Sequence, residues 1–189
     1  MKHKNFLYNF LSILYLEFLF SFLTFDVYNK SSIINIFIFS LIISSIITMI
    51  NNKIASYIIY SILGFYFSMQ FILKKVFGFY FSFNLLKLTD QVLKFGGTTI
   101  ISILKNIYAI ILFFLPLILI IIYKNKIEKE KNILKYGIIL IISTLLFVFD
   151  IKLQKSNENS IYYLYTSIND VSLNNEKLGV INSGMLDLY

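Results

Sequence analysis

The stretch FILKKVFGFYFSFNLLKLTDQVLKF, residues Phe71 to Phe95, lies between three apolar runs and two further ones, and the rest of the chain is arranged around it. Its second half carries apolar residues at helical spacing: Leu85, Leu88, Val92 and Phe95. Polar residues fall on the opposite face: Lys87, Asp90, Gln91 and Lys94. This pattern predicts an amphipathic helix that lies in the membrane interface, with its lysines toward lipid phosphates and its end at Gly96 and Gly97.

The composition is that of an integral membrane protein. Hydrophobic residues make up 58% of the 189 residues and charged residues only 14%, and the mean hydropathy is +0.76. A water-soluble domain needs more polar surface. The net charge is +7, and every basic residue is a lysine. Because these lysines sit between apolar runs, we expect anionic lipid and not nucleic acid as their partner.

Two chemistries are excluded by residue types that are missing or rare. The chain has no cysteine, which rules out disulfides and thiolate catalysis. Its one histidine is His3, so the usual Cys and His ligands of zinc or iron are not available. We therefore expect no catalytic residue and no metal site in this chain. Asp170, Glu176 and Asp187 lie in a polar region, but their spacing matches no calcium loop.

The predicted fold is all-α, with five transmembrane helices and the interfacial helix between the third and the fourth. The apolar runs that predict the spans are residues 6–25, 33–50, 54–73, 100–123 and 136–149. The first run is too long for a signal peptide and ends without small residues, so it reads as an uncleaved span. Gly64 would allow close helix packing, and Pro116 is tolerable where a neighbouring helix satisfies the carbonyl that it frees.

These spans divide the chain into a membrane domain, residues 1–151, with an outer loop at 74–99, and a polar tail, residues 152–189. The tail is too short for much of a core, so we expect a loose segment or the start of a linker. An odd number of spans puts the termini on opposite sides. Lysines divide eight to eight between the two sides, but the cluster from Lys124 to Lys135 favours a cytoplasmic N-terminus and an extracellular C-terminus.

Two stretches resemble a known family. FGFYFSFNLLKLTDQV, residues 77–92, is similar to the outer loop of the lipoteichoic acid synthase family, membrane enzymes of Firmicutes within the sulfatase superfamily. LNNEKLGVINSGMLDLY, residues 173–189, resembles the segment that follows the fifth span in that family. The five-span layout with a long loop after the third span also fits.

The resemblance implies a phosphoglycerol transferase that takes glycerol phosphate from phosphatidylglycerol at the outer leaflet of the bacterial plasma membrane. In the family, a threonine nucleophile and a manganese ion do this in an extracellular domain. No threonine of this chain matches that motif. The resemblance therefore implies the membrane-anchoring module of such an enzyme, inactive by itself, with the manganese in a catalytic domain that this chain lacks.

Lysines near the outer loop are the candidate lipid-binding residues: Lys74, Lys75, Lys87 and Lys94. They could form a cationic cradle for phosphatidylglycerol headgroups, or they could only hold an amphipathic helix on a negative surface. Inside the predicted spans, Glu17 and Lys105 are the intramembrane polar candidates. They could pair with each other, but Lys105 could also reach the interface and Glu17 could be protonated.

Two other functions remain open from the sequence. A non-catalytic membrane partner of cell-envelope machinery would use the same bundle as an interaction surface. A small transporter would need paired broken helices or several charges facing a pore.

Overall fold

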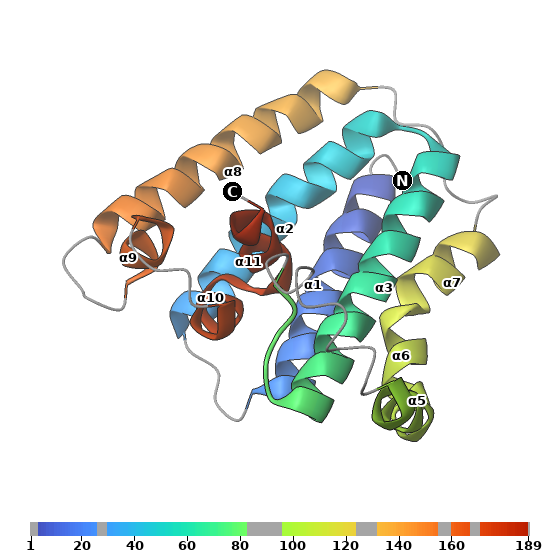
Figure 1. The fold of residues 1–189 in the computed structure, drawn as a ribbon. Coiled ribbons are helices and arrows are strands. Elements are labelled where there is room, and N and C mark those ends of the chain that lie inside the picture. The colour runs from blue at the N-terminus through green and yellow to red at the C-terminus, as the bar shows by residue number, and fades with distance from the viewer. Residues whose placement is uncertain are drawn as a thin grey trace.

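The computed structural model describes residues 4–25, 30–82, 96–123, 132–154, 160–166 and 171–188, which form helices and short connections without any strand (Figure 1). Four of these helices are long and apolar enough to cross a membrane: α1 (Lys4–Thr24), α2 (Lys30–Ile50), α3 (Lys53–Phe77) and α8 (Ile133–Leu153). They confirm the all-α class, and these four helices overlap the predicted spans at 6–25, 33–50, 54–73 and 136–149.

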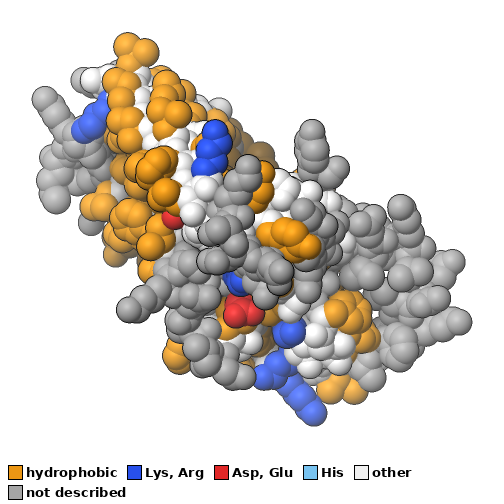
Figure 2. Space-filling model, turned by 90° about the vertical axis from the view of Figure 1, so that its left-hand side faces the viewer, with side chains coloured by type: hydrophobic (Ala, Val, Ile, Leu, Met, Phe, Trp, Pro, Cys, Tyr) orange, Lys and Arg blue, Asp and Glu red, His pale blue; other side chains and the backbone are white. Residues whose placement is uncertain are grey.

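The long helices lie side by side in the order α8, α2, α1, α3 (Figure 1). We call the end of the bundle where α1, α3 and α8 finish and α2 begins the distal end. α8 packs mainly against α2, and much of its surface is apolar and exposed. Figure 2 shows hydrophobic side chains gathered over the upper left part of this view. Such a surface suits contact with lipid.

The third span is longer than the sequence predicted. α3 begins after Asn52, whose side chain accepts the backbone N–H of Ile54 and Ala55, and it ends at Gly78 in the left-handed conformation. The loop expected to begin at Lys74 therefore begins later, because Lys74 and Lys75 form the last turn of α3. Lysines are favourable there, since carbonyl groups are unpaired at a helix C-terminus.

The predicted fourth span, residues 100–123, is broken into three pieces. α5 (Gly96–Lys105) and α6 (Ile107–Phe113) meet at Asn106, and α7 (Leu115–Ile122) follows after Phe114. α5 points along the line of sight in Figure 1, across the direction of the long helices. Gly96, expected to follow a helix, begins one. A fifth span stays a prediction, and the interfacial helix over 85–95 lies outside the described residues.

Pro116 explains a contact between α1 and the broken segment. Proline has no N–H to donate to the residue four positions earlier, so the carbonyl of Leu112 is left without its helical partner. The hydroxyl of Tyr15 on α1 donates to this carbonyl at 3.2 Å, and that of Tyr8 donates to the carbonyl of Pro116 itself. The prediction that a neighbouring helix would satisfy the freed carbonyl is confirmed.

The core of the bundle is built around α1. Ile13, Leu16 and Phe20 are wholly buried, and the Phe20 ring packs against Phe67 of α3 and Phe113 of α6. Nearer the start of α1, a buried polar triad joins three helices. The Asn9 amide donates to the Thr48 hydroxyl of α2 at 2.9 Å and accepts the Tyr60 hydroxyl of α3 at 2.8 Å.

The chain after α8 is not a loose tail where the structure describes it. Three short helices follow: α9 (Ile161–Thr166), α10 (Val171–Leu178) and α11 (Val180–Asp187). α9 contacts α8, α10 packs on α2, and α11 reaches α1 (Figure 1). Val180 and Ile181 of this segment share the core of the bundle. That the segment begins a linker to a further domain stays a prediction.

The contact at Pro116 predicts a coupled pair of substitutions. Tyr15→Phe should lower the free energy of unfolding by about 1 kcal/mol, because it removes the hydroxyl that donates to the Leu112 carbonyl. In a Pro116→Ala background the restored N–H can reach that carbonyl, so the same change should cost much less. Thermal unfolding of the four variants in detergent measures this cycle. Equal costs of Tyr15→Phe in both backgrounds would contradict the assignment.

Gly64 gives a second prediction, because a Cβ there would lie 2.9 Å from the Phe114 ring. Gly64→Val should therefore destabilise the bundle by roughly 1–3 kcal/mol through overpacking. Gly137→Val is the matched control, since the nearest atom to a Cβ at that helical glycine is 3.9 Å away. We expect a lower midpoint of thermal unfolding for Gly64→Val than for the control, and equal midpoints would refute close packing at Gly64.

Candidate functional site

The candidate site is the contact between the start of α11 and the bundle, which we call the seat of α11. Glu17 lies at its centre. Glu17 lies on α1 and is 3% exposed. Its two carboxylate oxygens accept the backbone N–H of Val180 and Ile181, each at 2.8 Å. These N–H groups belong to the first turn of α11, where a helix has no internal partners for them and where negative charge is favourable. A side chain from the first membrane helix thus caps a helix more than 160 residues later.

Gly179 makes this cap possible. It precedes α11 with φ 84° and ψ 163°, a backbone conformation that is essentially confined to glycine. A Cβ at this position would lie 2.9 Å from a Glu17 oxygen and 3.0 Å from Ile36 of α2. No larger residue fits between α1 and α2 here without moving them, so the glycine fixes how closely α11 approaches the carboxylate.

A second polar side chain, Gln70 of α3, holds the chain that follows Gly78. Its amide oxygen accepts the N–H of Phe81 at 2.9 Å, and its amide nitrogen donates to the carbonyl of the same residue at 3.1 Å. Gln70 also donates to the Tyr66 hydroxyl at 3.0 Å. The Gln70 amide thus pairs with both backbone groups of Phe81, as a neighbouring strand would. This contact keeps residues 79–82 against α3.

The two held segments meet each other. The Ser82 hydroxyl donates to the carboxylate of Asp187 at the end of α11, at 2.8 Å. Gly184 of α11 lies so close to Tyr66 that a Cβ there would overlap the Tyr66 hydroxyl. The segment at 79–82 and α11 therefore form one assembly, which is fastened to α1 by Glu17 and to α3 by Gln70.

A layer of buried amides surrounds the seat. Asn174 and Asn175 of α10 and Asn182 of α11 are each 1–2% exposed. The Asn182 oxygen accepts the hydroxyl of Tyr165 on α9, and burial raises the pKa of Tyr165 to about 12. Tyr165 therefore remains a neutral hydrogen-bond donor at physiological pH. This pair links α9 to α11, so all three C-terminal helices are joined to the seat.

The predicted lysine cradle is only partly described. The Lys74 ammonium donates to the Gly78 carbonyl at 3.1 Å and lies 4.6 Å from the centre of the Tyr80 ring, so it takes part in ending α3. Lys75 is exposed beside it. Lys87 and Lys94 lie outside the described residues. A shared headgroup site for the four lysines stays a prediction.

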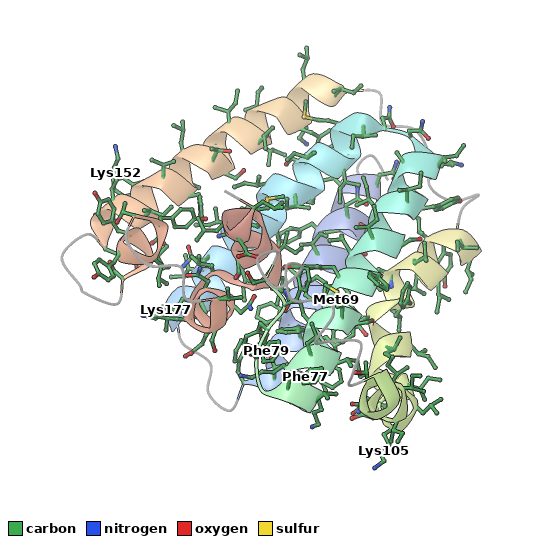
Figure 3. All side chains as sticks on the ribbon, viewed as in Figure 1. Met69, Phe77, Phe79, Lys105, Lys152 and Lys177 are labelled. Carbon is green, nitrogen blue, oxygen red and sulfur yellow. The ribbon has the colours of Figure 1, made fainter. Side chains whose placement is uncertain are left out.

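Glu17 and Lys105 are not brought together. Lys105 is exposed at the end of α5 and points away from the bundle (Figure 3), whereas both oxygens of Glu17 accept backbone donors in the core. Sequence reasoning singled out Glu17 as a candidate and left its pairing with Lys105 open, without naming the partner that the structure shows. Its partner is backbone, which no charge pattern reveals. The glycines of LGVINSG, residues 178–184, were the available signal.

The described residues contain no group of three potential metal ligands among His, Cys, Asp and Glu. Glu176 is exposed on α10, and Asp187 is held by Ser82. Glu17 and Gln70 both bind backbone groups of other segments, so the seat of α11 is suited to holding polypeptide in place. No family model, curated protein or solved structure matches the chain.

Two glycines with positive φ allow a matched test of the seat. Gly179→Ala should release α11, because it combines backbone strain with a clash against Glu17. Gly78→Ala is the control, since Gly78 has φ 77° but nothing within 4 Å of an added Cβ. We expect at least a further 1 kcal/mol of destabilisation from Gly179→Ala. Thermal unfolding and limited proteolysis of residues 160–188 measure it, and equal behaviour of the two variants would contradict the cap.

Proposed function

We propose that the chain is the membrane module of a phosphoglycerol transferase of the lipoteichoic acid synthase type, which acts on phosphatidylglycerol at the outer leaflet. In this proposal the bundle anchors a catalytic domain and fixes where it leaves the membrane. The threonine nucleophile and the manganese ion belong to that domain, so the bundle alone carries out no chemistry.

The observation that carries the proposal is the contact between the two stretches that resemble the family. Residues 77–92 and 173–189 are far apart in sequence, yet Ser82 of the first is hydrogen-bonded to Asp187 of the second. An independent pair of matches would have no reason to lie together. A layout in which loop and tail form one assembly would produce this arrangement, and so the contact supports the proposal.

The seat also has the mechanical properties that an anchor requires. Glu17 and Gln70 each hold their segment by two hydrogen bonds, and a bidentate contact fixes orientation as well as position. Glu17 and Gln70 are positioning residues in this account. A domain that follows α11 would keep a constant height and orientation above the lipid surface, within reach of lipid headgroups.

A transporter is less well supported by the same geometry. Transport sites use broken helices whose free carbonyls and charges face the substrate. Here the carbonyl freed by Pro116 is taken by Tyr15, and both oxygens of Glu17 are taken by α11. A non-catalytic partner of the cell-envelope machinery would need the same bundle, and the following experiment separates it from the proposed function.

The proposed function predicts a loss of polymer when the gene is removed. Deletion in the source bacterium should abolish the glycerol phosphate polymer of the envelope, and the wild-type gene should restore it. Glu17→Ala should restore several-fold less, because α11 loses its cap. Glu176→Ala is the matched control, since that glutamate is exposed on α10, and it should restore polymer fully.

The readout is the amount and length of polymer extracted from the membranes. Normal polymer in the deletion strain would contradict the transferase assignment and favour the non-catalytic partner. Equal rescue by Glu17→Ala and wild type, at equal protein level, would contradict the anchoring role of the seat.

A further inference from the structure

The surface between the C-terminal helices and the bundle is unusually polar for a buried interface. Asn174, Asn175 and Asn182 are buried on α10 and α11, and Ser32 and Ser40 are buried on α2. α10 packs on α2, and the Gly179 junction touches Ile36, which lies one helical turn from each of these serines. α10 and α11 on one side and α2 on the other thus carry buried polar side chains of a kind that is common on water-exposed surfaces.

Several of these polar atoms have no hydrogen-bond partner in the docked arrangement. They are both amide atoms of Asn174, both amide atoms of Asn175, the amide nitrogen of Asn182 and the hydroxyl oxygens of Ser32 and Ser40. A buried polar atom without a partner loses its hydrogen bonds to water and forms no new one, which costs free energy. Docking therefore carries a cost at these positions, and release of α10 and α11 into water would remove it.

Other contacts oppose this cost. The Glu17 cap satisfies two N–H groups, and Leu178, Val180 and Ile181 are buried against the bundle. Strong attraction at one end of the interface is therefore set against unpaired polar atoms at other positions. Interfaces that never open are normally satisfied throughout.

We propose that α10 and α11 form a reversible latch, which is held by Glu17 and which opens to expose polar side chains of α1 and α2. In the closed state the latch covers Glu17, Ser32 and Ser40. In the open state water or a polar group satisfies these side chains and the three asparagines. The opening is a property of this chain by itself and does not depend on the proposed transferase function.

The absence of cysteine from the sequence makes a direct test possible. Ser183→Cys introduces a single thiol on α11, where the side chain is 1% exposed. Two reference thiols bracket its reactivity in the purified chain in nanodiscs. Ser172→Cys is on the exposed side of α10, and Ala109→Cys is in the core of α6. A water-soluble maleimide is the probe, and the labelling rate is the readout.

We expect the Ser183→Cys thiol to react more slowly than Ser172→Cys and faster than Ala109→Cys. Glu17→Ala should increase its rate about tenfold or more, because the latch loses the acceptor of two backbone hydrogen bonds. Asn175→Leu should decrease the rate, because it replaces an unpaired buried amide by an apolar side chain of similar size. The two substitutions thus act in opposite directions.

The proposal fails if Ser183→Cys reacts like Ala109→Cys in both the wild-type and the Glu17→Ala backgrounds, which means a permanently closed seat. It also fails if Ser183→Cys reacts like Ser172→Cys throughout, which means an undocked segment. If Glu17→Ala accelerates labelling at Ala109→Cys as well, the bundle itself has loosened. The Asn175→Leu comparison then decides, and an unchanged or faster rate at Ser183→Cys overturns the latch.

Discussion

A carboxylate buried among apolar helices must find donors, and in this chain the rest of the distal structure follows from that requirement. Glu17 finds two N–H groups at the start of α11. In lipid, apolar side chains gain little by leaving the bilayer for a protein core, so polar contacts and close packing decide which segments associate. This cap therefore determines where the C-terminal helices lie.

α1 serves as the organising helix because each of its faces carries a different polar contact. Asn9 joins it to α2 and α3, Tyr15 joins it to the broken segment at Leu112, and Glu17 joins it to α11. The contacts occur at successive levels along the helix. Together they specify the neighbours of α1 in a bundle whose apolar surfaces alone would permit several arrangements.

The sequence predicted the parts that depend on composition and local pattern. Hydropathy located four long helices, proline chemistry predicted the satisfied carbonyl near Pro116, and the rarity of buried charge identified Glu17. Contacts between distant segments were not predictable in this way. The cap pairs the Glu17 side chain with backbone N–H groups, and every residue except proline has such a group, so residue type does not reveal the partner. The segment after residue 152 was predicted to be solvated because it is rich in Asn and Ser, which occur both on surfaces and in buried contacts. Its glycines, Gly179 and Gly184, were the signal of close packing.

The most direct test of the account is amide hydrogen exchange at Val180 and Ile181, measured by NMR in nanodiscs. First-turn amides of a helix normally exchange quickly, because they lack a partner within the helix. The account predicts that both exchange as slowly as amides in the middle of α11, and that Glu17→Ala abolishes this protection. Rapid exchange of both amides in the wild-type chain would contradict the central role of Glu17.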